Sequence, residues 1–325
     1  MKKARDAENG LVSASVKVSA LYVPFLEDAR ARTSTGNYTN LESLGRNWIL
    51  PNVGHKKVSA LTEQDMQNVL NLAYTKGKSR KYIRNIRGAF TAFLKYARKC
   101  GATLLRPDDL VIPNKAVSGT RSVLNDRDIE KLFSSSTTVY NNTQCEDFYI
   151  HAYRLLAVTG LRPSELCELQ RKKQNDKNSL AVTGGYNRFG EHTRGKTENA
   201  VRTFILPSIG AKILKDQAAM LRSKKIVSPW LFPSEDGDQL NGNSLYRYWK
   251  RYEKANGLSD ISLYELRHTF VSLCQRTIPE ALVKPVIGHS SAMPSYNTYG
   301  HQMDGDLELV ASMIDAAYTD ILGEK

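Results

Sequence analysis

A short stretch rich in turn-forming residues, 113–120, constrains the fold of this chain more than any other feature. It reads Pro-Asn-Lys-Ala-Val-Ser-Gly-Thr, and such residues favour loops over helices or strands. The hydrophobic pattern also changes there, because no alternating strand pattern precedes residue 110 and strand-like segments follow it. A chain of 325 residues has enough material for two domains. We therefore expect a flexible tail at 1–10, a helical domain at 11–112, a linker at 113–120 and a second domain at 121–325.

The positive charge of the chain belongs almost entirely to its first part. The formal net charge is +13, and residues 1–115 hold 20 Lys and Arg against nine Asp and Glu, a surplus of +11. Between Lys76 and Lys99 there are nine basic residues and no acid, and the apolar residues recur at helical spacing. A merely solvated helix face usually mixes the two signs, so this face predicts an anionic partner such as the DNA backbone. The candidate DNA contacts are Lys76, Lys78, Arg80, Lys81, Arg84 and Arg87.

Apolar periodicity predicts the other elements. In the first domain we expect helices at 16–31, bent or interrupted near Pro24, and at 61–74. In the second domain strands are expected at 179–183 and 201–206, joined by a glycine-rich connection. The second domain is therefore expected to be mostly helical around a small antiparallel sheet. Its expected helices are 125–133, 147–158, 244–254, 264–276, 282–287 and 306–322.

The sequence also bears on compartment and metal content. No apolar run is long enough to span a membrane, and the basic start is not followed by the apolar stretch of a secretory signal. The four cysteines are scattered and have no zinc-binding spacing. We expect a cytoplasmic, bacterial, nucleoid-associated protein with reduced thiols, no metal, no cofactor and no membrane partner.

The segment 190–197, Gly-Glu-His-Thr-Arg-Gly-Lys-Thr, matches the phosphate-binding loop pattern GxxxxGK[ST]. That loop requires a helix beginning at its lysine, because backbone N–H groups at the helix start bind the phosphate. Here a strand-like segment follows and ends at Pro207. We reject ATP binding and instead expect Lys196 near the turn of a hairpin, where its long side chain can reach a ligand.

Three motifs in the second domain suggest chemistry at a phosphate. Phosphodiester cleavage builds negative charge on the nonbridging oxygens, and two arginines can bind these oxygens with charged hydrogen bonds. Arg162 follows a glycine at the junction of two helices, and Arg267 lies about one helical turn beyond Tyr264. Taken alone, Arg162 could be a surface or capping residue and Arg267 a member of an ordinary ion pair. The motifs are Thr159-Gly-Leu-Arg162-Pro-Ser-Glu165-Leu, Tyr264-Glu-Leu-Arg267-His268-Thr-Phe, and Gly288-His289-Ser-Ser followed by Tyr296-Asn-Thr-Tyr299-Gly-His301.

With these motifs in this order, the second domain resembles the tyrosine recombinase (integrase) family, and more closely the integrases of conjugative transposons and related phages. The resemblance implies a helical, SAM-like core-binding domain and a mixed α/β catalytic domain. It also implies that Tyr299 is the nucleophile, with Tyr296 as its competitor. A phenol with a pKa near 10 is only about 0.1% ionised at pH 7, so its reaction needs a base or a strongly positive site.

The resemblance assigns further roles. Lys196 is expected to protonate the departing 5′ oxygen, and His289 to hydrogen-bond the phosphate. The family usually has His where this chain has Tyr264, whose phenol can donate a hydrogen bond but cannot act as a base at neutral pH as an imidazole can. His268 is expected to pack or to form a hydrogen bond inside the core. Glu165 is expected to hold Arg162 or the start of the next helix.

This sequence departs from the family at other positions. Pro294 and Ser295 stand where related integrases often have Asp-Thr. Many relatives carry an additional N-terminal arm-binding domain. This chain begins almost at the core-binding bundle, so it is expected to be either a shorter type or a truncated form. The helix at 306–322 could cover its own core or dock on a neighbouring protomer, and the sequence leaves both open.

We therefore expect a site-specific recombinase that cleaves and rejoins DNA through a 3′-phosphotyrosyl intermediate, integrating or excising a mobile element without ATP or metal. The implied partners are double-stranded attachment or core sites, three further protomers in a tetrameric synapse with a Holliday junction, and accessory directionality or DNA-bending factors. One alternative is a DNA-binding or architectural recombination factor without catalysis. A second is a type IB topoisomerase, which shares this chemistry.

Overall fold

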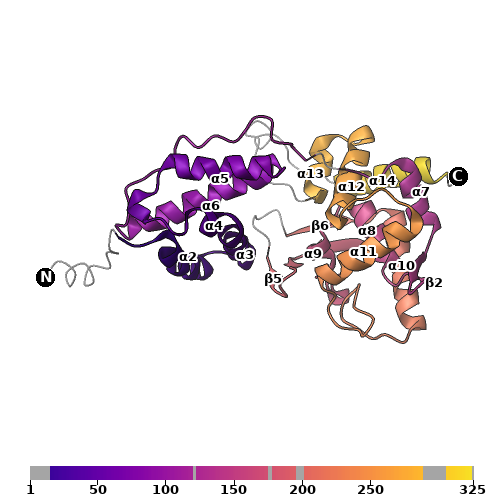
Figure 1. The fold of residues 1–325 in the computed structure, drawn as a ribbon. Coiled ribbons are helices and arrows are strands. Elements are labelled where there is room, and N and C mark those ends of the chain that lie inside the picture. The colour runs from indigo at the N-terminus through magenta and orange to yellow at the C-terminus, as the bar shows by residue number, and fades with distance from the viewer. Residues whose placement is uncertain (1–14, 120–121, 175–177, 195–200, 288–304, 324–325) are drawn as a thin grey trace. The chain divides into compact units, whose positions relative to one another are not determined.

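The computed structural model describes residues 15–119, 122–174, 178–194, 201–287 and 305–323. The chain divides into two compact units, Met1–Thr120 and Arg121–Lys325, each built around its own hydrophobic core (Figure 1). Helices dominate both units, and the strands form small antiparallel sheets. The expected fold class, mainly helical with a small antiparallel sheet, is confirmed.

The first unit is a bundle of helices around a core rich in aromatic side chains. Three of its helices begin at side-chain caps that the sequence supplies. Thr62 forms a capping box with Asp65, and Ser34 and Ser79 each accept a hydrogen bond from the backbone N–H three residues later. Phe25 and Phe93 pack edge to face at its centre, with ring centroids 5.6 Å apart. The elements are α2 (Val18–Arg32), α3 (Thr35–Leu44), the π-helical turn η1 (Gly45–Ile49), α4 (Leu50–Val53), the 3₁₀ turn η2 (Val58–Ala60), α5 (Glu63–Thr75) and α6 (Arg80–Lys99).

The spacing of apolar residues at the start of this unit predicted only some of its helices. We expected a bend or an interruption near Pro24, and the interruption is wrong, because helix α2 continues through Pro24. Helix α3 was not expected, because its few buried residues, Leu41 and Leu44, leave almost no apolar stripe. The turn η1 follows it, and a Cβ on Gly45 would lie 2.3 Å from the Tyr22 ring, so this close approach requires glycine.

The second unit contains all three sheets of the described chain, each with two antiparallel strands. The expected strand pair is confirmed as β3 (Ser179–Val182) and β6 (Arg202–Ile205), with Val182 opposite Arg202. The connection between them forms a second pair, β4 (Gly185–Tyr186) and β5 (His192–Thr193). The third pair, β1 (Thr137–Tyr140) and β2 (Thr143–Glu146), was missed although Asn141 and Asn142 form its two-residue turn with positive φ.

The helices of the second unit mostly follow the apolar pattern. Asn125 caps the first of them, because its side chain accepts a hydrogen bond from the Asp128 backbone N–H. One long helix, Ser208–Ser223, was not expected, since Gly210 and Gln217 on its buried face interrupt the apolar stripe. The helices are α7 (Asp126–Ser134), α8 (Ile150–Thr159), α9 (Pro163–Leu166), α10 (Ser208–Ser223), α11 (Gly242–Asn256), α12 (Leu263–Thr277), α13 (Glu280–Ile287) and α14 (Asp306–Leu322), with the 3₁₀ turn η3 (Arg171–Lys173).

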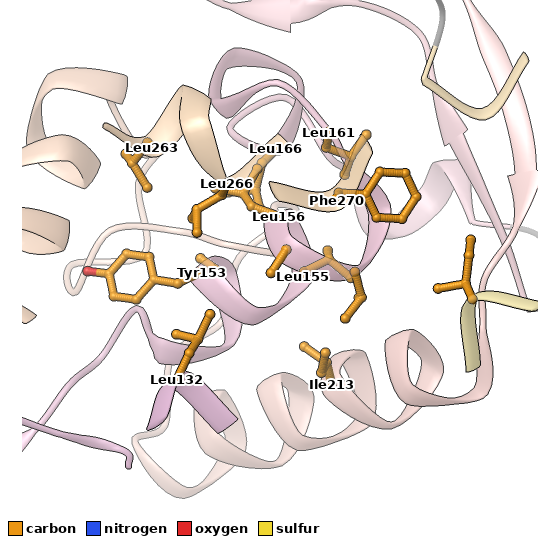
Figure 2. Close-up of a cluster of buried hydrophobic side chains, with 14 of the residues drawn as sticks. Leu132, Tyr153, Leu155, Leu156, Leu161, Leu166, Ile213, Leu263, Leu266 and Phe270 are labelled. Carbon is orange, nitrogen blue, oxygen red and sulfur yellow. The ribbon is translucent and has the colours of Figure 1, made fainter. Parts of the chain in front are cut away.

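Helix α8 is the centre of the second core. Figure 2 shows its side chains Leu155 and Leu156 among those of the neighbouring helices, with Leu266 and Phe270 of α12 on one side and Ile213 of α10 on another. All of these side chains are buried. This packing fixes the end of α8 against α12, which is where the motifs with Arg162 and Arg267 meet.

Helix α14 packs on its own unit. The fully buried Tyr318 donates a hydrogen bond to the carbonyl of Ala157 in α8, at 2.6 Å. The Asp315 carboxylate accepts from the backbone N–H groups of Ser208 and Ile209, at 2.7 and 3.0 Å, and so caps α10. Of the two roles left open for this helix, covering its own core is the one observed. Throughout the described ranges, no helix is both long and apolar enough to cross a membrane.

Candidate active site

Arg162 lies at a sharp junction between two helices. Helix α8 ends at Gly160, whose backbone is left-handed with φ 62°, and Pro163 occupies the first turn of α9. A Cβ on Gly160 would lie 2.4 Å from Phe270, so only glycine fits this turn. Both boundaries follow the sequence pattern, and together they place Arg162 at the N-cap of α9.

Glu165 holds Arg162 in place. Its carboxylate accepts from the Arg162 backbone N–H at 2.9 Å and from the Arg162 Nη1 at 2.6 Å. Burial alone would raise the pKa of Glu165, but hydrogen bonds and charge from Arg202 and then Arg162 lower it below the ordinary value. Glu165 is therefore an ionised, buried anchor for Arg162, as expected from the sequence.

Arg267 is the most deeply buried cation of the site. Only 1% of the residue is exposed, and its guanidinium donates to the carbonyls of Gly160 and Ile287 at 2.7 and 2.6 Å. Burial and then the charge of Arg162 lower the pKa of Arg267 to about 10, so the guanidinium remains charged at neutral pH. Arg267 thus joins the turn that precedes Arg162 to the end of α13.

Tyr264 lies in the first turn of the helix that carries Arg267 and is 43% exposed. Its ring packs edge to face against His268, at 5.2 Å between centroids, so His268 is half-buried beside Tyr264 rather than deep in the core. Burial would lower the pKa of Arg162, but Glu165, followed by the Tyr264 phenol, raises it. Arg162, Arg267 and Tyr264 therefore share one electrostatic environment.

The other candidate residues of the site lie outside the described residues. These are Lys196, His289, Tyr299 and its competitor Tyr296. The described elements that flank them do reach the arginine cluster. Strand β6 follows Lys196 and carries Arg202, which binds Glu165, and α13 ends at Ile287, just before Gly288 and His289.

Arg202 is the residue of this site that sequence reasoning missed. Its side chain is 7% exposed, its Nη1 and Nη2 donate to the two carboxylate oxygens of Glu165 at 3.2 and 2.9 Å, and its Nε donates to the Val286 carbonyl at 2.6 Å. One feature of the sequence could have indicated it: Arg202 lies within an otherwise apolar and β-branched strand, where a charged side chain needs a buried partner.

A second carboxylate anchors the β4–β5 hairpin. Glu168 accepts from Gln239 at 3.1 Å and lies 2.8 Å from the Nδ1 of His192 on β5. On β4, a Cβ on Gly185 would lie 3.1 Å from the Ser164 hydroxyl, so the hairpin lies close against α9. The connection that carries Lys196 is thereby tied to the helix that Arg162 begins. Within the described ranges, no group of three or more His, Cys, Asp or Glu side chains could hold a metal.

The basic residues of the first unit have mixed surroundings. Lys81 and Arg84 are exposed on α6, whereas Arg80 and Arg87 donate to the carbonyls of Asn114 and Leu110, at 3.4 and 3.3 Å. Lys76 and Lys78 precede α6 and lie over the rings of Trp48 and Tyr82. The opposite stripe of α6, including Ile83, Phe90 and Leu94, is fully buried as the spacing predicts.

Comparisons with known proteins agree on one group. The Phage integrase family model matches residues 122–305. A XerC-like tyrosine recombinase of Caldanaerobacter subterraneus is 24% identical over 273 residues, covering 75% of this chain and 68% of the relative. The integrase of a Staphylococcus phage is 22% identical over 334 residues, covering 90% of this chain and 88% of the relative.

Solved structures share the fold. The Tn1549 transposon integrase in complex with transposon right end DNA has a TM-score of 0.68 and 19% identity, and the match covers 90% of this chain and 98% of that one. A lambda integrase tetramer bound to a Holliday junction has a TM-score of 0.65 and 19% identity, covering 86% of this chain and 80% of that one.

Proposed function

Because the chain belongs to the Phage integrase family of tyrosine recombinases, we propose that it is a site-specific recombinase that integrates or excises a mobile element. In this proposal it cleaves and rejoins DNA through a 3′-phosphotyrosyl link on Tyr299. Relatives named as a phage integrase and a transposon integrase support the mobile-element role.

The observation that carries the proposal is the pair Arg162 and Arg267. The two guanidiniums come from different elements, and each is held in place by neighbouring groups: Arg162 by Glu165 at 2.6 Å, Arg267 by two backbone carbonyls. They lie close enough for the charge of one to lower the pKa of the other. Such preorganised like charges are costly unless an anion comes between them, and a phosphodiester in its cleavage transition state is that anion.

The chemical step needs four movements of bonds and protons. The Tyr299 oxygen attacks the phosphorus and passes its proton to water, the bond from phosphorus to the 5′ oxygen breaks, and Lys196 protonates the departing oxygen. Arg162 and Arg267 bind the nonbridging oxygens, assisted by His289 and by a hydrogen bond from Tyr264. The 5′-hydroxyl of a second duplex reverses the step, and the phosphotyrosyl link conserves the bond energy without ATP or metal.

The partners follow from the same proposal. The first unit, with exposed Lys81 and Arg84, grips double-stranded DNA at its core site through phosphate contacts. Lambda integrase forms a tetramer on a Holliday junction, which supports a four-protomer synapse for this chain. Accessory directionality or DNA-bending factors complete the proposed assembly.

Covalent trapping tests the proposal. A pool of nicked duplexes with a randomised centre is incubated with the protein, and the DNA that remains attached after denaturation is amplified and reselected. The expected result is enrichment of one sequence and a denaturant-resistant adduct that disappears in Tyr299→Phe. An adduct that persists in Tyr299→Phe would contradict the assignment of the nucleophile.

The same material separates the alternatives. A DNA-binding factor without catalysis would bind the pool but yield no adduct. A type IB topoisomerase would relax a supercoiled plasmid that lacks the enriched sequence. A recombinase is expected to relax or recombine only plasmids that contain it.

A further inference from the structure

Arg202 makes contacts to two segments that are far apart in the sequence. Its two terminal nitrogens donate to both oxygens of Glu165, and its Nε donates to the carbonyl of Val286 near the end of α13. The side chain is 7% exposed, and the Glu165 side chain 6%. A buried guanidinium with a bidentate carboxylate and a carbonyl acceptor has little freedom to move.

Each segment that Arg202 touches also bears a candidate catalytic residue. Glu165 shares its carboxylate between Arg202 and Arg162. Val286 lies in the last turn of α13, and His289 follows that turn in the sequence. Arg202 itself stands on the strand that follows Lys196.

The end of α13 receives a second buried arginine as well. Arg267 donates to the Ile287 carbonyl at 2.6 Å, next to the Val286 carbonyl that Arg202 occupies. The last carbonyls of a helix have no partners within the helix and carry partial negative charge, so cations are favoured there. Two arginines from different elements therefore cap one helix end.

We propose that Arg202 is a positioning residue that holds Arg162, through their shared Glu165, and the last turn of α13 in the geometry required for cleavage. The inference rests on the proposed recombinase function. Arg202 does not touch the phosphate in this account, and it acts through Glu165 and the Val286 carbonyl. Its planar fork makes all three contacts at once, which the single nitrogen of a lysine cannot do.

Loss of Arg202 should also change the response to acid. Among the described residues, the charged groups that act on Glu165 are Arg162 at the start of α9, Arg202 on β6 and Arg267 on α12. Without Arg202, burial of Glu165 is less well compensated, so its pKa rises. As the pH falls, Glu165 then becomes protonated sooner and releases Arg162, and the cleavage rate declines at a higher pH than in the unaltered protein.

The test compares Arg202→Met and Arg202→Lys with a matched control, Arg154→Met. Arg154 is also a partly buried arginine that caps a helix, since its Nε donates to the Leu132 carbonyl of α7 at 2.9 Å. Its other hydrogen bonds go to Phe133, Ser135 and Ser136, away from Arg162, Arg267 and Tyr264. Thermal unfolding establishes the temperature at which all variants are folded. The rate of adduct formation on the enriched duplex is then measured across pH, together with DNA affinity.

We expect Arg202→Met to lower the adduct rate about a hundredfold at unchanged DNA affinity, because small misplacements of catalytic groups cost about that much. The fall of its adduct rate on the acid side of the pH profile should move to higher pH. Arg202→Lys should be more stable than Arg202→Met, but its adduct rate should stay below a tenth of the rate of the unaltered protein. Arg154→Met should lose stability yet keep the rate and pH profile. An adduct rate in folded Arg202→Lys within about threefold of the unaltered protein overturns the proposal.

Hydrogen exchange separates this inference from the proposed function. Amides in the peptide covering Glu280–Ile287 should exchange at least tenfold faster in Arg202→Lys than in the unaltered protein, and at the unaltered rate in Arg154→Met. This readout needs no DNA. If the unaltered protein forms no adduct, the recombinase proposal fails while the exchange rates still decide whether Arg202 holds α13. Equal exchange in all three proteins refutes the positioning role.

Discussion

At the scale of single residues, the site depends on a buried carboxylate that serves two arginines. Glu165 accepts from Arg162 and Arg202, and the buried Arg202 would not be tolerated at this depth without a counter-ion. The sequence motif predicted the Glu165 contact to Arg162, because the two are three residues apart. It could not predict Arg202, which folding brings to Glu165 from a strand 37 positions away.

Replacement of Glu165 tests this arrangement. Glu165→Gln leaves Arg162 and Arg202 without their buried counter-charge and should lower the free energy of unfolding by about 3–5 kcal/mol at pH 7. The folded pKa of Glu165 is lowered, so its stabilisation is complete above the unfolded pKa and is lost as pH falls through the folded pKa. Urea titrations should therefore show a difference that shrinks below about pH 4.

The control for that experiment is Glu308→Gln, which removes an exposed carboxylate from α14. It should change stability by no more than about 0.5 kcal/mol. A Glu165→Gln protein as stable as this control at pH 7 would contradict the anchoring role.

Tyr264 offers a second test at this scale. Its phenol lies in the shared field of the two arginines and is the group proposed to donate a hydrogen bond to the phosphate. Tyr264→Phe should slow adduct formation about 10- to 100-fold, the value of one hydrogen bond to a charged group. Tyr246→Phe, an exposed tyrosine on α11, should have no effect. If both variants react at the unaltered rate, Tyr264 has no role in cleavage.

At the scale of elements, the spacing of apolar residues predicted the helices and strands whose buried faces are apolar without interruption. Helix α6 is of this kind, since its core positions are apolar throughout. In the β3–β6 pair, Leu180, Val182 and Phe204 form the apolar core face. Helix α10 was missed because its buried face contains Gly210 and Gln217, and the latter donates to the Leu231 carbonyl. Its N-terminus is also capped from α14 by Asp315, a contact that no local pattern can reveal.

The Asp315 cap can be tested through its effect on stability. Asp315→Ala removes the acceptor for the N–H groups of Ser208 and Ile209 and should lower the free energy of unfolding by about 0.5–2 kcal/mol. Asp320→Ala is the matched control, because Asp320 is exposed near the other end of the same helix. Equal urea midpoints for the two variants would show that α14 does not stabilise α10 through this contact.

At the scale of the whole molecule, positive charge has a different distribution in the two units. The surplus of +11 within residues 1–115 suits a surface that binds a duplex, whereas the site in the second unit uses a few buried cations. Composition predicted the kind of partner. It could not show which basic residues remain exposed, because Arg80 and Arg87 bind carbonyls of the segment that follows α6.

Salt dependence tests this division. The double variant Lys81→Ala/Arg84→Ala should weaken binding uniformly across DNA sequences and reduce the slope of log affinity against log salt by about 2, roughly 0.9 for each lost phosphate contact. Arg222→Ala/Lys224→Ala removes the same charge from the end of α10. An equal loss of slope in both proteins would mean that net charge alone governs binding.

The central claim, that the chain transfers DNA strands through Tyr299, is tested most directly by locating the attached nucleotide. The adduct formed on the enriched duplex is digested with nuclease and protease, and the modified peptide is sequenced by mass spectrometry. The expected result is a nucleotide joined through its 3′ phosphate to Tyr299. Attachment to Tyr296, or to a serine, would contradict it.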